Sequence, residues 1–405
     1  MIGLAIFALP LAGPRPATAA APAPTPPASA LPSEMPLPIE TPLPTGTSLP
    51  TGTSLRPVQP ETPALRSARL LFSGDVLPHL SVVSAACAGR ESGRGPCDFA
   101  RLMEPTRELV SAVDLAVCHL EVPIVRANQT VTGYPSFGAP LALAEGLAVT
   151  GWDHCSTASN HSIDRGTGGI VSTKKALTAA GITSTGTSID VASAATTTER
   201  NVNGIRIAHL SATYGLNGLR LPKGQQWWVN LIVPVQLVAR ATAAKEAGAD
   251  IVVVSLHWGQ EYRSSPTPLQ QQIARALTAS GVVDLIVGHH AHVVQPIAEV
   301  NGKWVLYGLG NHLSGQRPVG PKLATQDGIL VEVTINEKVG GGFTVERPVV
   351  HPTWVNPSNK VVFRVDKMVT KTAIARTCGR LRRVIASSFF DPTSPCVRAT
   401  PGSSG

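Results

Sequence analysis

The chain has 405 residues, of which 43% are hydrophobic, 4% are aromatic and 15% are charged, and its formal net charge is +8. This length suits one large domain or two ordinary ones, and Val, Ile, Leu and Ala must fill the core because aromatic side chains are scarce. The basic residues are spread along the chain apart from a denser run at 376–383. Without a recognition motif, this distribution argues against a nucleic acid as partner and favours an anionic substrate or an envelope polymer.

The first 67 residues are expected to lie outside the folded domain. Residues 1–20 carry a short apolar run followed by Ala17-Thr18-Ala19, which resembles the hydrophobic core and cleavage site of a secretory signal. The basic residues that usually precede such a core are missing, so a disordered apolar tail is the alternative. Residues 21–67 are dominated by Pro, Thr, Ala and Ser, a composition that predicts a disordered spacer. We therefore predict an exported protein, secreted or associated with the cell envelope.

Ordered structure is predicted to begin near Ala68, with one domain over 68–355. Short apolar runs predict buried strands at 69–73, 114–118, 152–158, 204–210, 251–256 and 283–287. Helical spacing of apolar residues predicts helices at 139–149, 168–180, 233–247 and 269–279. Late strands without helices between them are predicted at 303–308, 328–333 and 343–350. The early alternation predicts parallel βαβ units in an α/β fold, and the late strands predict an added antiparallel part.

The cysteines favour disulfides in an oxidising compartment. Their number is even, and they are Cys87, Cys97, Cys118, Cys155, Cys378 and Cys396. Six cysteines permit fifteen pairings; we favour Cys87–Cys97 and Cys378–Cys396, which leaves Cys118–Cys155 by elimination. The second of these pairs would close a C-terminal extension at 356–405. Buried free thiols are the alternative, and the absence of a CxxC spacing argues against a thiolate zinc site.

Five polar segments directly follow predicted strands. They are Gly74-Asp75, His119-Leu120-Glu121, Asn160-His161 with Asp164, His257 to Glu261, and Gly288 to His292. Because the carboxyl ends of strands in an open α/β sheet converge on one crevice, these segments can share a ligand. Taken singly they have simpler explanations, since Gly-Asp often marks a turn, Asn160 could cap a helix, and a lone histidine is often only a satisfied polar residue.

The segment 289–292 is harder to explain without a function, because it holds three histidines in four residues. Alternate residues of an extended segment point the same way, so His290 and His292 are expected to face one site. Together the five segments offer oxygen and imidazole ligands without thiolates, a set that suits Mn, Fe or Zn. The donors suffice for two divalent ions, which would activate water near neutral pH.

Two further pairs of side chains are candidates for substrate contacts. Arg165 and Arg263 could hold an anionic group of a substrate, although solvated loop charge is the favoured alternative. Trp227 and Trp228 could form a wall of a substrate site or could serve packing alone.

The order of these motifs resembles the CapA family of poly-γ-glutamate capsule proteins, a branch of the calcineurin-like metallophosphoesterases. The resemblance covers roughly Leu70 to Pro352. Its motifs read Ser73-Gly74-Asp75, His119-Leu120-Glu121, Ser159 to Gly166, His257 to Tyr262, Gly288 to His292 with Gln295-Pro296, and Tyr307 to Asn311. This resemblance implies a four-layer α/β/β/α sandwich of mixed sheets flanked by helices.

The resemblance also implies the role of each site residue. The implied metal ligands are Asp75 and His292 for the first ion, Glu121 as the bridging carboxylate, and Asn160, His257 and His290 for the second ion. His161 would act over the substrate as acid or electrostatic stabiliser, and Asp164 would orient it. His119 stands where the family usually has Asn and could add a ligand, while His289 and Glu261 are possible additional site residues.

Three functions follow as hypotheses. The first is a metal-dependent phosphoester-type hydrolase linked to capsule or poly-γ-glutamate synthesis. The second is a non-hydrolytic component of capsule synthesis or export that binds an anionic polymer in the metal cleft. The third is a secreted structural domain whose histidine cluster binds no metal in a fixed stoichiometry.

Overall fold

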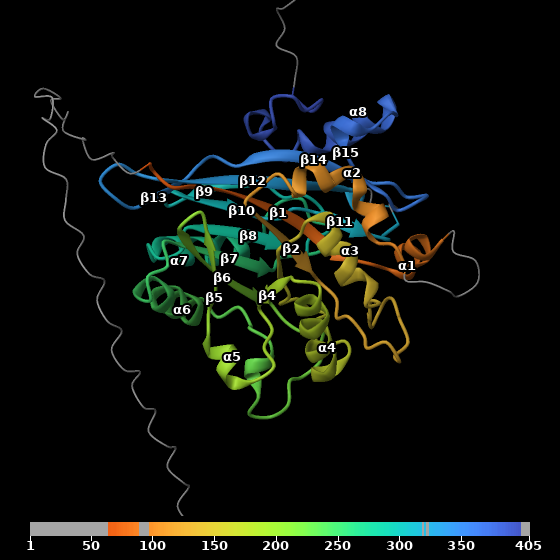
Figure 1. Cartoon of the computed structure of the whole chain (residues 1–405). Coiled ribbons are helices and arrows are strands. Elements are labelled where there is room, and N and C mark those ends of the chain that lie inside the picture. The colour runs from red at the N-terminus through yellow and green to blue at the C-terminus, as the bar shows by residue number, and fades with distance from the viewer. Residues whose placement is uncertain (1–63, 89–96, 318–319, 321–323, 398–405) are drawn as a thin grey trace, which may run out of the picture. The chain divides into compact units, whose positions relative to one another are not determined.

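Two β-sheets pack face to face, and helices cover their outer faces (Figure 1). The computed structural model describes residues 64–88, 97–317, 320 and 324–397. The signal-like segment predicted at 1–20 and the spacer up to residue 63 lie outside the described residues. The arrangement is the predicted four-layer α/β/β/α sandwich of mixed sheets, and that prediction is confirmed.

The larger sheet has nine strands in the order β15-β14-β12-β1-β2-β3-β4, with β11 paired to β1 and β13 paired to β12. These strands are β1 (Ser67–Leu77), β2 (Leu115–Leu120), β3 (His154–Ser156), β4 (Thr183–Thr185), β11 (Asn311–Ser314), β12 (Asp327–Glu337), β13 (Phe343–Val345), β14 (Val349–Val355) and β15 (Val362–Arg364). Strands β1 to β4 run parallel to one another, and β11 runs parallel to β1. Strand β12 pairs antiparallel with β1, and β12 to β15 add the predicted antiparallel part.

The smaller sheet has six strands in the order β5-β6-β7-β8-β10-β9. They are β5 (Thr198–Val202), β6 (Ile205–Thr213), β7 (Ile251–His257), β8 (Leu285–His289), β9 (Ile297–Val300) and β10 (Lys303–Leu306). Strands β6, β7, β8 and β10 are mutually parallel, and β5 and β9 run antiparallel at the two edges.

Two strand predictions are wrong in detail. The strand predicted at 303–308 is not part of the antiparallel addition, because β9 forms the sheet edge and its hairpin partner β10 fills the place parallel to β8. The strand predicted at 343–350 is two strands, β13 and β14, separated by a break that contains Pro348. Proline has no backbone N–H to donate to a strand ladder, so it interrupts the pairing there.

Helices on each side complete the outer layers. The helices are α1 (Leu80–Cys87), α2 (Ala100–Val110), α3 (Ala142–Thr150), α4 (Gly166–Ala179), α5 (Val191–Ala195), α6 (Pro234–Glu246), α7 (Pro268–Ala279) and α8 (Lys371–Leu381), with 3-10 turns η1 (Gln226–Trp228), η3 (Val365–Lys367) and η4 (Ser387–Phe389). Helices α1, α2 and α3 bury apolar side chains on the larger sheet, and α6 and α7 do so on the smaller one. Within the described residues, no helix has both the length and the apolar character that a membrane span needs.

The layer between the sheets is built by side chains that alternate along each strand. Phe72, Val117, Val253 and Val287 point into it from four strands and form one apolar cluster. Because side chains two residues apart share a face of a strand, the polar residues that follow Val117, Val253 and Val287 point into the same layer. Those residues are His119, Ser255, His257 and His289, and all four are buried.

The three predicted disulfides are present, so the alternative of buried free thiols is wrong. Cys87–Cys97 lies beside α1, Cys118–Cys155 joins β2 to β3, and Cys378–Cys396 joins α8 to the C-terminal segment. The extension is also held by polar contacts. Arg380 pairs with the buried Asp327 of β12, and Arg382 Nε donates to the Cys396 carbonyl at 2.7 Å.

Candidate metal centre

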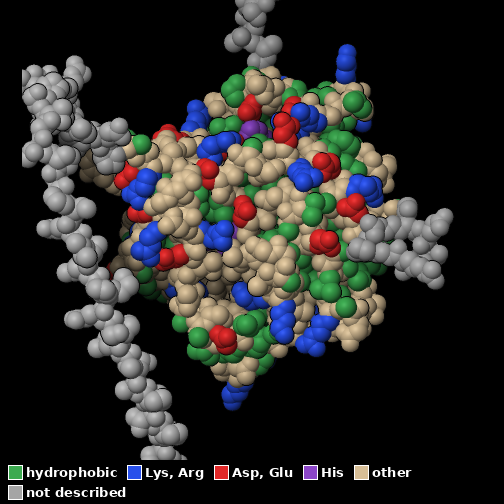
Figure 2. All heavy atoms as spheres, in the orientation of Figure 1, with side chains coloured by type: hydrophobic (Ala, Val, Ile, Leu, Met, Phe, Trp, Pro, Cys, Tyr) green, Lys and Arg blue, Asp and Glu red, His purple; other side chains and the backbone are tan. Residues whose placement is uncertain are grey.

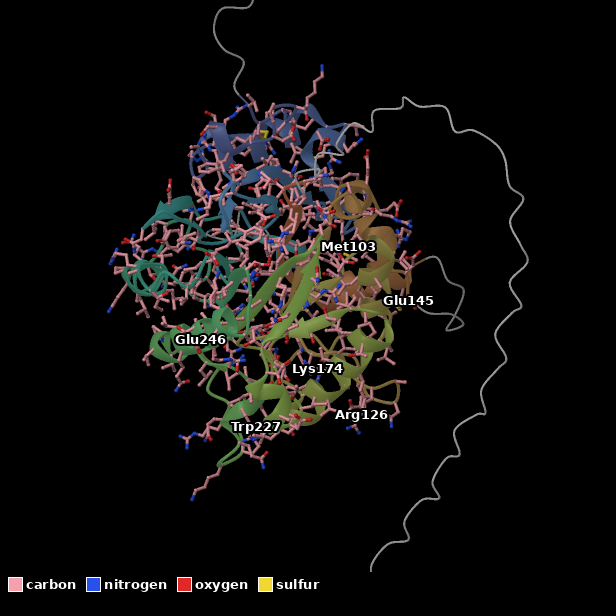
Figure 3. The ribbon with its side chains drawn as sticks, turned by 60° about the vertical axis from the view of Figure 1, so that its left-hand side comes forward. Met103, Arg126, Glu145, Lys174, Trp227 and Glu246 are labelled. Carbon is pink, nitrogen blue, oxygen red and sulfur yellow. A yellow bond between two sulfur atoms is a disulfide. The ribbon has the colours of Figure 1, made fainter. Side chains whose placement is uncertain are left out.

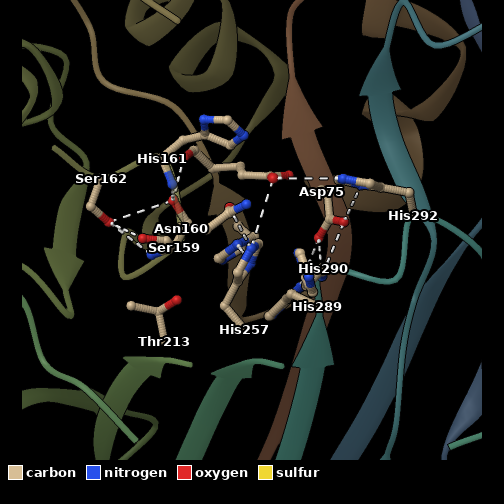
Figure 4. Close-up of polar contacts among 12 residues, drawn as sticks. Asp75, Ser159, Asn160, His161, Ser162, Thr213, His257, His289, His290 and His292 are labelled. Atoms are coloured by element: carbon tan, nitrogen blue, oxygen red, sulfur yellow. Dashed lines mark hydrogen bonds and ion pairs between the residues drawn. The ribbon is translucent and has the colours of Figure 1, made fainter. Parts of the chain in front are cut away.

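The six residues predicted as metal ligands meet at one end of the layer between the sheets (Figure 4). Asp75 lies near the end of β1, where the backbone N–H of Asp75 donates to the Gly310 carbonyl at 2.9 Å. A Cβ atom at Gly74 would lie 2.2 Å from the same carbonyl oxygen, so only glycine permits this close approach. Glycine is therefore needed before Asp75, because the backbone of β1 and the turn before β11 approach too closely for a side chain.

Asp75 is the centre of the first group of contacts. Its Oδ2 lies 3.0 Å from His292 Nδ1 and accepts from the backbone N–H of His290 at 3.2 Å. Its Oδ1 lies 3.4 Å from His289 Nδ1. Burial alone would raise the pKa of Asp75, but the hydrogen bonds from His289 and His292 outweigh it and hold the pKa well below its usual range. Asp75 is therefore an ionised carboxylate inside the protein.

Glu121 is a buried carboxylate without a hydrogen-bond partner. It is fully buried directly after β2, and neither of its oxygens has a hydrogen-bond partner. Its Oε1 lies 3.7 Å from His292 Nε2 and 3.8 Å from His257 Nε2. Burial raises the pKa of Glu121 well above its usual range. An isolated carboxylate in such a place is costly, and a cation is the natural partner for it, so these residues fit a metal ion.

His292 connects the two carboxylates through its two ring nitrogens. Burial lowers the pKa of His292, but Glu121 and Asp75 together raise it to about 9. Ligand atoms within 4.8 Å of one another form two groups, Asp75 with His119 and His257, and Glu121 with His290 and His292. This grouping differs from the one that the resemblance implies, in which Asp75 and His292 share an ion.

Asn160 faces His257 rather than a helix. Asn160 Oδ1 lies 2.9 Å from His257 Nε2, and Asn160 Nδ2 donates to Asn217 Oδ1 at 3.2 Å. The alternative that Asn160 caps a helix is wrong, because α4 starts later and its N-cap residue is Arg165. The amide oxygen is free of the backbone and available to a ligand.

The loop after β8 brings its histidines together by an unexpected route. The expectation of an extended segment is wrong, because His290 and His292 have φ values of 89° and 55° in a bend. Non-glycine residues seldom adopt this left-handed region, and such backbone strain gathers at functional sites. The two rings still lie close, with centroids 6.0 Å apart, and Tyr214 lies 4.6 Å from the ring of His290.

A cavity of about 660 Å³ opens beside the cluster. His161 and Asp164 line it, and His161 Nδ1 lies 2.7 Å from Asp164 Oδ2. Asp164 Oδ2 also accepts from the backbone N–H of Phe137 at 2.7 Å, which holds the carboxylate in place. With Nδ1 engaged, Nε2 is the nitrogen of His161 that remains for a substrate. The sequence singled out Asn160, His161, Asp164 and Glu261 of this lining and missed Tyr134, Asn217 and Arg220, whose loops carry no motif.

The arginines predicted as substrate contacts have structural partners. Arg165 Nε and Nη2 donate to the carbonyls of Phe137 and Ser136, each at 3.1 Å. Arg263 is exposed, and its Nε donates to Ser265 Oγ at 3.2 Å. Neither arginine lines the cavity. These contacts favour the alternative of loop charge that supports the local structure.

The adjacent tryptophans also lie away from the cavity lining. The rings of Trp227 and Trp228 stack with centroids 4.4 Å apart, and Trp228 packs on the small apolar cluster around Ile163. Figure 3 shows Trp227 near the lower end of the molecule. The packing alternative is therefore favoured over a substrate wall.

The candidate site lies inside the protein. On the face shown in Figure 2, basic side chains (blue) are interspersed with acidic ones (red), and little histidine (purple) is visible. The histidines of the cluster are buried. The candidate site is therefore an internal cluster reached through a cavity rather than a charged surface patch.

The chain resembles known capsule proteins in sequence. It is 35% identical over 162 residues to capsule biosynthesis protein CapA of Bacillus anthracis, a match that covers 39% of each chain. It is 32% identical over 219 residues to PGA biosynthesis protein CapA of Bacillus subtilis (strain 168), which covers 54% of this chain and 55% of the relative. The chain thus spans between about two fifths and just over half of the length of these relatives.

Solved structures and a family model complete the comparison. The chain resembles calcineurin-like phosphoesterase YfkN from Bacillus subtilis at 13% identity with a TM-score of 0.42, over 79% of this chain and 98% of that one. The model of the family described as bacterial capsule synthesis protein PGA_cap matches residues 69–316, more than half of the chain. This protein therefore belongs to the bacterial capsule synthesis protein PGA_cap family.

Proposed function

We propose that this protein binds two divalent metal ions and acts as a phosphoester-type hydrolase in capsule or poly-γ-glutamate synthesis. The observation that carries the proposal is the buried Glu121 carboxylate, which has no hydrogen-bond partner and faces two imidazoles. One ion would be held by Asp75 and His292, the other by Asn160, His257 and His290, with Glu121 between them. The oxygen and imidazole donors suit Mn, Fe or Zn.

Two divalent ions supply Lewis-acid chemistry, in that they activate water as a nucleophile near neutral pH and neutralise negative charge on the group being transferred. The chain itself supplies position and a proton. Asp164 fixes the ring of His161 through Nδ1, so Nε2 can donate a proton to a leaving oxygen in the cavity. Phe137 holds Asp164 through its backbone N–H, so the acid is oriented before a substrate arrives.

A second candidate function uses the same cleft without hydrolysis. The relatives from Bacillus are named for capsule and PGA biosynthesis rather than for hydrolysis. In this case the ions would hold carboxylates of an anionic polymer such as poly-γ-glutamate. In both cases we propose export to the cell envelope, because three disulfides are expected to persist in an oxidising compartment.

The test begins with metal content and then measures hydrolysis. The purified chain loaded with Mn²⁺ is assayed on bis-(p-nitrophenyl) phosphate beside the double variant Asp75→Ala, His290→Ala. We expect two ions per chain in the parent protein and a loss of at least a hundredfold in rate in the double variant. His351→Ala is the matched control, because His351 is a buried histidine that pairs with Glu332 in the other part of the larger sheet.

Each outcome decides between the hypotheses. Equal rates of hydrolysis in the parent and the double variant would refute the hypothesis that the protein is a hydrolase. Two bound ions without hydrolysis, together with metal-dependent binding of poly-γ-glutamate, would support the second candidate. If the parent protein binds no metal in a fixed stoichiometry, only the hypothesis of a structural domain remains.

A further inference from the structure

We propose that His119 binds no metal and instead sets the tautomer of His257, so that His257 Nε2 is presented to the metal ion. This inference rests on the proposed metal binding but assigns a separate role to a residue outside the six proposed ligands. His119 lies within ligand distance of Asp75 and His257, so its type and place alone would equally suit a metal ligand. The hydrogen bonds of its ring decide between the two roles.

The ring of His119 is held on three sides. Its Nδ1 lies 2.8 Å from Ser156 Oγ on the neighbouring strand β3. Its Nε2 lies 2.9 Å from His257 Nδ1 on β7 of the opposite sheet. The ring also stacks on His289, with centroids 3.9 Å apart and planes inclined by 12°. Both nitrogens are engaged and the side chain is fully buried, so His119 has no free lone pair for a metal.

Ser156, His119 and His257 form a row of hydrogen bonds, and the protons of this row can be placed in two ways, called the two orders below. A neutral imidazole carries one N–H, so each ring donates on one side and accepts on the other. In the first order, the Ser156 hydroxyl donates to the Cys118 carbonyl at 3.4 Å, His119 Nδ1–H donates to Ser156, and His257 Nδ1–H donates to His119. His257 Nε2 is then a bare lone pair, which is what metal ligation requires.

The second order reverses every donor. Ser156 donates to His119 Nδ1, His119 Nε2–H donates to His257 Nδ1, and His257 Nε2–H donates to Asn160 Oδ1 at 2.9 Å. Only this order makes the last contact a hydrogen bond. In the first order two acceptors would face each other there, and a cation between them would resolve the conflict. Asn217 fixes the orientation of the Asn160 amide by accepting from its Nδ2.

A metal ion therefore selects the first order. The two orders differ only in which atoms of the row carry the three protons, and a cation at His257 Nε2 would favour the first order. The number of protons on the three side chains is unchanged. In this way His119 and Ser156 let His257 become a metal ligand while both rings stay neutral, without leaving a buried nitrogen unpaired.

Two measurements test the proposal, both with Zn²⁺ as the probe and neither dependent on activity. Nitrogen-15 NMR of the imidazoles is expected to show the Nε2–H tautomer of His119 and His257 without metal, and the Nδ1–H tautomer of both with Zn²⁺. Zinc titration of His119→Ala is expected to show a 10–100-fold weaker affinity for one of two ions, the usual effect of losing a residue that orients a ligand. Ser156→Ala is expected to show a smaller loss in the same direction.

The matched control is His154→Ala. His154 is equally buried on the adjacent strand and pairs with Thr183 at 2.7 Å, but it makes no contact with His257. Its zinc affinity should equal that of the parent. X-ray absorption at saturating zinc gives the final check, since a positioning role leaves the number of imidazole ligands unchanged in His119→Ala, and a loss of one imidazole would show that His119 is a ligand.

The outcomes separate this inference from the proposed function. If the parent chain binds no zinc, the proposed function fails first. If it binds two ions and His119→Ala binds them equally well, or the tautomers do not change with zinc, the role of His119 is refuted while the metal site stands. Should His119→Ala not fold, the NMR measurement on the parent and the Ser156→Ala titration still decide.

Discussion

The layer between the two sheets is apolar at one end and polar at the other, although the same strands build both ends. On β2, Val117 is followed two residues later by His119, and on β8 Val287 is followed by His289. Both ends are equally buried. The apolar end stabilises the fold, whereas the polar end keeps side-chain atoms that have no hydrogen-bond partner, among them Ser211 Oγ, His290 Nδ1 and both oxygens of Glu121.

The difference shows where stability and function divide. Buried polar groups without partners cost about 1–3 kcal/mol each, so the polar end lowers the stability that the apolar end supplies. Strain in the loop at His290 and His292 adds to that cost. A ligand that satisfies these groups would recover it, which is the expected behaviour of a binding site on a rigid scaffold.

The largest expected effect comes from the apolar end. Phe72→Ala removes a fully buried ring from the cluster between the sheets and should lower the free energy of unfolding by about 3–5 kcal/mol. Urea denaturation measures this. Zinc affinity of the folded variant should stay at the parent value, and a drop of tenfold or more would show that the two ends are not separable.

The Cys118–Cys155 disulfide joins β2 to β3 on the helix-covered face of the larger sheet, directly before the paired residues His119 and Ser156. The double variant Cys118→Ala, Cys155→Ala should lose about 2–4 kcal/mol of stability and bind zinc less tightly, because the register of β2 and β3 is less fixed. Urea denaturation and zinc titration measure the two effects.

The control for that variant is Cys87→Ala, Cys97→Ala, which removes a disulfide beside α1. It should lose stability without losing zinc affinity. Equal zinc affinity in both double variants would mean that the disulfide between β2 and β3 does not support the site.

The smallest expected effect is a gain in the free energy of unfolding rather than a loss. Glu121→Gln replaces a buried carboxylate that has no hydrogen-bond partner by a neutral amide of the same shape. With a chelator present, the variant should be more stable than the parent by about 1–2 kcal/mol. The parent must either bury a charge or take up a proton because burial raises the pKa of Glu121, whereas the amide is neutral without a proton from solvent. Denaturation in urea with EDTA is the measurement, and a destabilised variant would contradict the view that the polar end is costly when metal-free.

Much of the scaffold was predictable because it is encoded locally. Apolar runs marked β1, β2, β6, β7 and β8, and helical spacing marked α3, α4, α6 and α7. The missed elements are of two kinds. Strands β4 and β15 have three residues each, which is too short for a periodic signal. Helices α2 and α8 do carry apolar residues at helical spacing and were overlooked, although Pro105 inside α2 argues against a helix there.

The sequence by itself determined which chemical groups gather at the strand ends, because a strand places alternate residues on one face whatever lies opposite. Only the tertiary structure decided which atoms meet. The contact of His119 with His257 joins two sheets across 138 positions of sequence, and the left-handed backbone at His290 and His292 depends on the loop around it. Such pairings arise from packing between distant segments, and no local pattern in the chain records them.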